Sequence, residues 1–138
     1  MTYSDVYSAI LEDVHAIANE ATDMLILKGP LPNSESIAID VATGAPESVM
    51  LNRNTVESMN IVINGKSENM ALIRGEMGKV HAALTGAAKY PNKEQYQITS
   101  IETTQIPSYA ERESSGVWLY VSAIEVKFYH RKEIEIRQ

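Results

Sequence analysis

The strongest chemical motif in the sequence is Gly65-Lys66-Ser67, which matches the last three positions of a phosphate-binding P-loop. A P-loop has the form G-x-x-x-x-G-K-[ST], in which a long glycine-bearing turn wraps backbone N–H groups around the phosphates. Here Asn60 stands where the first glycine is required, and residues 61–63 alternate like a strand. A tight turn and a helix cap therefore account for these residues better than nucleotide binding does.

Other residues that could bind metal or carry catalysis are scattered. His15, His81 and His130 fall in no metal-binding spacing, whereas zinc needs three or four ligands. The chain has no cysteine, which excludes disulfides and thiol nucleophiles, and no G-x-S-x-G motif. Four acids in predicted turns and loops are expected to be solvated rather than catalytic. These acids are Asp40, Glu47, Glu111 and Glu113. We therefore expect no enzyme activity, no cofactor and no metal.

Several aromatic residues raise the question of a platform that stacks nucleic-acid bases. Trp118 and Tyr120 fall on the predicted core face of their strand, and the formal charge of -6 offers no attraction to phosphates. Core packing is the better interpretation, and we expect no specific nucleic-acid binding. The other aromatics considered are Tyr90, Tyr96 and Tyr109.

Composition is that of one globular domain. The chain has 138 residues, with 44% hydrophobic and 22% charged, and this length buries about two thirds of the unfolded surface. The N-terminus has acids where a signal peptide needs an apolar core, which predicts a protein made in the cytosol. The longest apolar run, residues 117–124, is far shorter than the roughly 20 residues of a membrane span. We expect no membrane partner.

The element at the centre of the chain is a strand followed by a helix. Residues 59–63 alternate in polarity, and Asn64-Gly65 is expected to turn the chain. From Ser67, a predicted N-cap, apolar residues recur at helical spacing up to Gly86, which is predicted at C′, just after the C-cap of the helix. A second stripe of the helix carries only small residues, which predicts close approach of another backbone and a loss of stability or assembly when a glycine becomes leucine. This stripe is Ala71, Gly75, Gly78 and Ala82.

The elements around this centre follow from periodicity and turn signals. Residues 4–21 predict an amphipathic helix, 24–27 a helix extension or a strand, and 37–41 a short strand before a turn at Thr43-Gly44-Ala45-Pro46. Residues 96–104 predict a strand with a bulge, and 105–116 a long loop or extended hairpin tip. Together these patterns predict an α+β domain spanning residues 1–138. Two helices pack on one face of a mainly antiparallel, mixed sheet of four to five strands.

In the last predicted strand, residues 117–130, the first half carries apolar side chains on both faces. Its even positions form a core face, and its odd positions Val117, Leu119, Val121 and Ala123 are apolar too. A sheet with helices on one side has a largely polar second face, so this half needs a cover from its own chain or from another subunit.

Two further segments are candidates for contact with other molecules. In the tail, residues 131–138, Ile134 and Ile136 alternate with charged residues and predict an edge strand or an arm lying on a neighbour. The predicted loop contributes a solvated segment or a contact loop that orders on assembly. Its residues are Tyr109, Glu111, Arg112 and Glu113.

Several short motifs resemble the minor capsid or tail terminator proteins of long-tailed bacteriophages. They are residues 29–32 leading to the strand 37–39, Ala42-Thr43-Gly44, the strand ending in Ile63-Asn64-Gly65-Lys66-Ser67, and the strand 118–130. The family commonly has a second glycine where Ala45 stands here.

The resemblance implies a non-enzymatic virion component assembled in the host bacterial cytoplasm. Such proteins close into a ring, usually of six subunits, that caps the tail tube and joins it to the head. The implied partners are other copies of the chain, the tail tube protein and the head-side connector. A head–tail neck adaptor and a small cytosolic enzyme or ligand-binding domain remain the alternatives.

Overall fold

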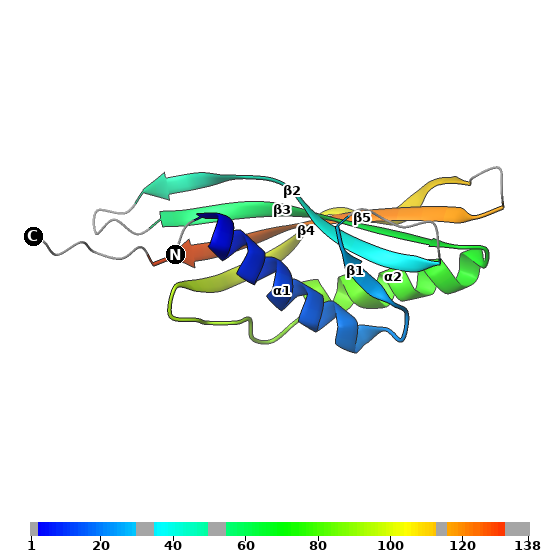
Figure 1. The fold of residues 1–138 in the computed structure, drawn as a ribbon, viewed down its shortest axis with the longest axis horizontal. Helices are drawn as coiled ribbons and strands as arrows, with labels where there is room; N and C mark the ends of the chain where they lie inside the picture. Colours follow the sequence, from blue (N-terminus) through cyan, green and yellow to red (C-terminus); the bar gives the residue numbers. More distant parts are fainter. Residues whose placement is uncertain (1–2, 30–34, 50–54, 113–115, 132–138) are drawn as a thin grey trace, which may run out of the picture.

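The fold was described from a computed structural model, which covers residues 3–29, 35–49, 55–112 and 116–131. These residues form two helices and five strands (Figure 1). In chain order the elements are α1 (Tyr3–Ala21), β1 (Ile26–Lys28), β2 (Ser36–Val49), β3 (Thr55–Ser67), α2 (Met70–Thr85), β4 (Tyr96–Arg112) and β5 (Trp118–His130).

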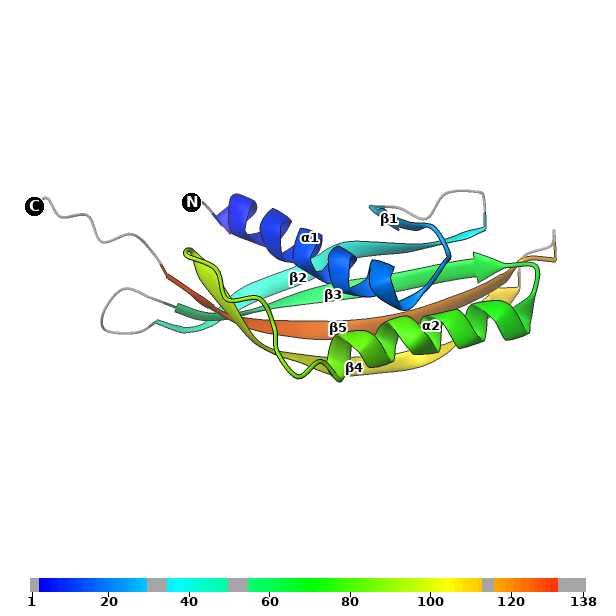
Figure 2. The same cartoon turned by 90° about the horizontal axis from the view of Figure 1, so that it is seen from below.

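The five strands form one mixed sheet in the order β1-β2-β3-β5-β4. β1 runs parallel to β2, and every other neighbouring pair is antiparallel. Both helices lie on the same face, with α1 against β1 and β2 and α2 against β3, β4 and β5 (Figure 2). The predicted fold class is thereby confirmed, with five strands.

The last strand lies between the two strands that flank α2. β5 is antiparallel to both β3 and β4, so those two strands run parallel to each other. After β3 the chain crosses over the sheet through α2 and returns in β4. The last strand, β5, then inserts between β3 and β4. It is therefore an interior strand of the sheet, with a paired strand on each side.

The core lies between the helices and the inner face of the sheet. Most of the predicted apolar stripe of each helix is fully buried, as are the inward-facing residues of the three central strands. Three members of the predicted stripes, Ile17, Ala21 and Met70, are half-buried. The largest of these buried side chains include Phe128, Ile10, Ile61, Ile73 and Met77. Periodicity thus identified the inward faces of α1, α2, β3 and β5.

The strand before α2 is longer than predicted, and two local predictions there are wrong. β3 continues through Asn64, Gly65 and Lys66 to Ser67 because these residues pair with β2 on one side, up to Lys66, and with β5 on the other. The N-cap is Asn69, whose Oδ1 accepts a hydrogen bond from the Leu72 amide at 3.1 Å. At the other end the helix stops at Thr85, and Gly86 is the C-cap rather than the predicted C′ residue, with its amide donating to the Ala82 carbonyl oxygen.

Two predicted breaks in the chain are also strand. The prediction of a turn at residues 43–46 is wrong, because β2 continues through this segment to Val49. Its pairing with β3 is irregular between Val41 and Gly44 and again after Pro46. For residues 105–116 the predicted long loop is wrong up to Arg112, because β4 continues there as one arm of a hairpin with β5, in agreement with the alternative of an extended hairpin. The bulge predicted near Ile98 is confirmed by a register shift before Ser100. Edge pairing with bulges therefore overrides the proline and glycine signals.

Close helix packing occurs at a glycine of the strand and not at the small stripe of the helix. A Cβ built on Gly65 would lie 2.7 Å from Ile73 Cδ1 and 2.8 Å from Met77 Sδ, so α2 sits directly on this residue. Around Gly75 and Gly78 no described atom outside α2 lies within 4 Å of such a Cβ, and the flanking alanines, Ala71 and Ala82, are exposed. No backbone of the described chain makes the close approach predicted for this stripe, and an approach by another copy stays a prediction.

Candidate functional site

The residues that resemble a P-loop lie inside the sheet. Gly65 pairs with Ile37 on one side and Tyr120 on the other, so its backbone belongs to the β-ladder rather than to an anion-binding loop. The Ser67 hydroxyl donates a hydrogen bond to Glu35 and accepts one from the Asn69 amide at 2.9 Å. These contacts serve the strand-to-helix junction, although a strand and the Asn69 cap replace the predicted tight turn and Ser67 cap. They leave no phosphate cradle at this position.

The three histidines lie in three different environments. Among the described residues, no group of three or more His, Asp or Glu side chains is arranged to hold a metal ion. His15 Nε2 donates to the carbonyl oxygen of Ile26 at 2.9 Å and ties α1 to β1. His81, on α2, is buried, with Nε2 2.8 Å from Thr103 Oγ1 and no partner at Nδ1 among the described residues. Burial lowers the pKa of His81.

A buried polar pair joins β3 and β5 at one end of the core. His130 Nδ1 lies 2.9 Å from Glu57 Oε2, and both side chains are almost completely buried. The Tyr7 hydroxyl on α1 lies 3.5 Å from the other carboxylate oxygen. Sequence analysis missed this pair, although the signal existed: Glu57 shares the parity of Met59, and His130 that of Phe128.

A second tyrosine and acid connect the same end of the molecule to α1. Tyr96, the first residue of β4, donates its hydroxyl hydrogen bond to Asp13 on α1. Burial, together with this hydrogen bond and the negative charge of Asp13, raises the pKa of Tyr96 well above its usual range. Lys93 Nζ also lies 3.5 Å from Asp13. These polar contacts fasten α1 to the far edge of the sheet.

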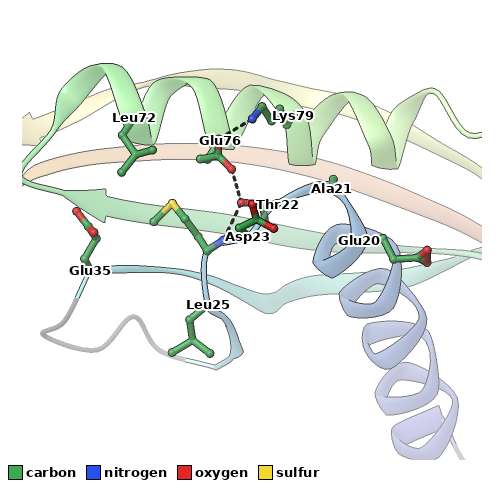
Figure 3. Close-up of a pocket in the computed structure, with 10 residues that line it drawn as sticks. Glu20, Ala21, Thr22, Asp23, Leu25, Glu35, Leu72, Glu76 and Lys79 are labelled. Atoms are coloured by element: carbon green, nitrogen blue, oxygen red, sulfur yellow. Dashed lines mark hydrogen bonds and ion pairs between the residues drawn. The ribbon is translucent and has the colours of Figure 1, made fainter.

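A pocket lies where the end of α1 meets the first half of α2 (Figure 3). It encloses about 460 Å³. The Thr22 hydroxyl donates to Glu76 at 2.5 Å and accepts from the Met24 amide at 3.1 Å, so it joins the two helices at the base of the pocket. Lys79 Nζ donates to the second oxygen of Glu76 at 2.8 Å.

The surroundings of Glu76 in this pocket do not favour a role as a general base. Hydrogen bonds from Lys79 and Thr22 lower the pKa of Glu76. A general base is effective when its pKa lies near the working pH, and a lowered carboxylate pKa makes a weaker base. The Glu76 carboxylate is therefore a structural acceptor between the helices.

The pocket combines apolar walls with an acidic rim. Leu25 and Leu72 face it from opposite sides, with 59% and 38% of their surfaces exposed (Figure 3). They are two of the four large hydrophobic side chains that are exposed in the described part of the chain. The acids around it are Glu20, Asp23, Glu35 and Glu76, and the one base that lines it is Lys79. This pocket fits an apolar side chain accompanied by a positive charge.

The apolar odd positions of β5 lie on the face opposite the helices. Val117, just before the strand, and Leu119, Val121 and Ala123 are half-buried by their neighbours within the sheet. The described helices both cover the other face, so no helix covers these side chains. On the neighbouring strand β3, the aliphatic Val62 lies directly opposite Ala123.

The outer half of the β4–β5 hairpin carries an aromatic and arginine cluster. The Tyr109 ring packs edge-on against Trp118 at 5.6 Å and Tyr120 at 6.2 Å, and the Arg112 guanidinium lies 4.9 Å from the centre of the Trp118 ring. Tyr109 keeps 52% of its surface exposed. Tyr109, Glu111 and Arg112, predicted as a loop, are therefore ordered on a strand.

Several predicted site residues are apart or outside the described structure. Asp40 on β2 and Glu111 on β4 are both exposed, on strands separated by β3 and β5. Glu113, Ile134 and Ile136 lie outside the described residues, and so does the Glu47 side chain. In the part of the chain that the structure describes, no helix is long and apolar enough to span a bilayer.

Comparison with known proteins shows a shared fold. No protein-family model and no curated protein sequence matches the chain. The chain is similar in structure to a protein chain of a virion. That solved structure is described as the virion of a native gene transfer agent (GTA) particle. The TM-score is 0.52 at 12% sequence identity, and the match covers 84% of each chain. At this identity the match shows that the two chains share an overall fold.

Proposed function

We propose that this chain is a structural component of a bacteriophage or phage-like virion. The observation that carries the proposal is the fold that it shares, over 84% of both chains, with a chain of the gene transfer agent virion. The sequence motifs that resemble tail terminators support the same class independently of that likeness. The pocket chemistry agrees, because Glu76, whose pKa is lowered, is held as an ion-paired hydrogen-bond acceptor.

Within that class we propose a tail terminator that forms a ring, usually of six subunits, on the tail tube and contacts the head-side connector. Two surface features support self-assembly. The apolar half of β5 lies on the face without helices, and the small stripe of α2 is open enough for a second backbone to approach closely. In a ring, a neighbouring copy would bury the exposed apolar surface of β5 and the exposed backbone surface of α2.

Assembly of the purified chain tests this proposal. Light scattering over a concentration series and negative-stain imaging with isolated tail tubes are expected to show a ring seated on the tube end. A strict monomer at high concentration that also leaves tube ends bare contradicts the tail-terminator role. Pull-down against purified tube protein and purified connector distinguishes a terminator from a head–tail neck adaptor, which would bind the connector alone.

A variant pair on the outer sheet face links assembly to β5. Val121→Glu places a charge in the apolar half and is expected to prevent ring formation while the monomer stays folded. Ser100→Glu is the matched control, because Ser100 lies on the same face beside Lys127 in the polar half. Equal assembly by both variants would remove the β5 face from the proposed interface.

A further inference from the structure

We infer that the tail segment after Arg131 docks into the pocket between α1 and α2 of a second copy of this chain. The inference rests on the proposed self-assembly and names the contact that links one copy to the next. It starts from the position of the tail, because Arg131 is fixed at one end of the sheet. Its amide donates to the Gln95 carbonyl at 2.9 Å, and its guanidinium donates to the Lys93 carbonyl and to Asn92 Oδ1.

The pocket lies at the opposite end of the sheet. Leu25 precedes Ile26, which pairs with Ile37, and the register continues through Gly65 to Tyr120 on β5. From Tyr120 to His130 the strand advances about 33 Å at about 3.3 Å per residue. The pocket and the start of the tail are therefore separated by most of the length of the sheet.

The tail is too short to reach its own pocket. From Arg131 a fully extended chain carries Ile136 no farther than about 18 Å, at about 3.6 Å per residue. That is roughly half of the distance along β5. A contact between the isoleucines of the tail and Leu25 therefore joins two different copies.

The chemistry of the tail matches that of the pocket. In an extended chain Lys132, Ile134 and Ile136 share one face, and Glu133 and Glu135 share the other. The first face offers two branched apolar side chains to the leucine walls and one cation to the acidic rim. The glutamates point away from the pocket, where they stay in water.

The contact also has consequences for symmetry. A tail at one end of a copy and a pocket at the other end make a heterologous contact, in which each copy donates to one neighbour and receives from another. Such contacts close into a ring when the rotation between copies closes. The inferred docking is thus of the kind that a ring requires.

Disulfide trapping tests the docking directly, because the chain contains no native cysteine. Full-length Leu25→Cys is mixed with a size-tagged Ile134→Cys, and the mixed disulfide is followed on non-reducing gels. Ala16→Cys is the control partner, since Ala16 is exposed on α1 and belongs neither to the pocket lining nor to the small stripe of α2. We expect the Leu25 pair to cross-link about tenfold faster than the control pair, since docking raises the local thiol concentration. Equal rates would overturn the docking.

A second measurement separates this inference from the proposed function. The variant Ile134→Ser/Ile136→Ser is expected to weaken self-association at least about tenfold in sedimentation velocity, whereas Glu133→Ser/Glu135→Ser, on the other face of the tail, leaves it unchanged. If the isoleucine variant still forms wild-type rings on tail tubes, the docking is wrong and the terminator role stands. If the cross-link forms but no ring appears on tubes, the docking stands and the terminator role is wrong.

Discussion

Replacing Gly65 and Gly75 separately by alanine tests how α2 sits on the sheet. The same chemical change is made on β3 beneath the helix and on the exposed side of the helix. At Gly65 the new methyl would lie 2.7 Å from Ile73 Cδ1 and 2.8 Å from Met77 Sδ. Carbon atoms normally pack at about 3.5–4.0 Å, so both side chains must move by close to an ångström.

The magnitude follows from what surrounds those side chains. Ile73 and Met77 are completely buried, so their displacement strains the core, and overpacking of this kind costs about 1–3 kcal/mol. Part of the cost is offset because alanine restricts the unfolded chain more than glycine does, by about 0.4–1 kcal/mol. The expected net loss for Gly65→Ala is about 1–2 kcal/mol, which lowers Tm by roughly 3–8 °C in a domain of this size.

Gly75→Ala is expected to shift stability the other way. No described atom outside the helix lies within 4 Å of its Cβ, and a glycine inside a helix costs about 1 kcal/mol relative to alanine. We expect a gain of about 0.5–1 kcal/mol. Thermal and urea unfolding followed by circular dichroism, at a concentration where light scattering shows monomers, measures both variants. Shifts of the same sign in the two variants would refute this account of the packing.

Three further predictions concern the polar contacts. Glu57→Leu is expected to cost about 1–3 kcal/mol because His130 Nδ1 loses its buried partner, and urea unfolding of Glu57→Leu/His130→Leu should show a smaller loss than the two single variants added together. Burial lowers the pKa of His81, so its stabilising contribution is complete above the unfolded pKa of 6.5 and is lost as pH falls from there toward the lowered folded value. The Tm difference between about pH 7.5 and about pH 5.5 should therefore shrink in His81→Gln, and an unchanged difference would count against this assignment. Thr22→Val removes the hydrogen bond to Glu76 and should lower the free energy of unfolding by about 1–3 kcal/mol, with wild-type stability in the variant as the contrary result.

The largest errors of sequence reasoning came where strand pairing outweighed local signals. Gly65 and the segment around Gly44 carry turn residues, yet each lies in a strand that has a partner over its whole length. A glycine or proline costs a strand little when the neighbouring strands supply the hydrogen bonds or when a bulge absorbs the irregularity. Whether such partners exist is a property of the sheet, so a window of sequence cannot reveal it.

The candidate sites also divide into one that local sequence patterns identified and others that depend on contacts between distant segments. Periodicity identified the apolar odd face of β5, because alternation along a strand fixes which side chains share a face. It did not identify the pocket, since Thr22 at the end of α1 and Glu76 on α2 meet only after the helices pack. The Glu57–His130 pair was missed for the same reason, as its members lie on different strands.

The sequence by itself determined the fold class, the inward faces of the two helices and the absence of cysteine chemistry. These features depend on composition and on spacings of a few residues, which any window of the chain contains. Only the tertiary structure decided that Gly65, and not Gly75 or Gly78, is the point of close packing. It also decided that the pocket and the start of the tail lie at opposite ends of the sheet. Both depend on which distant segments meet, and that is settled by packing of the whole chain.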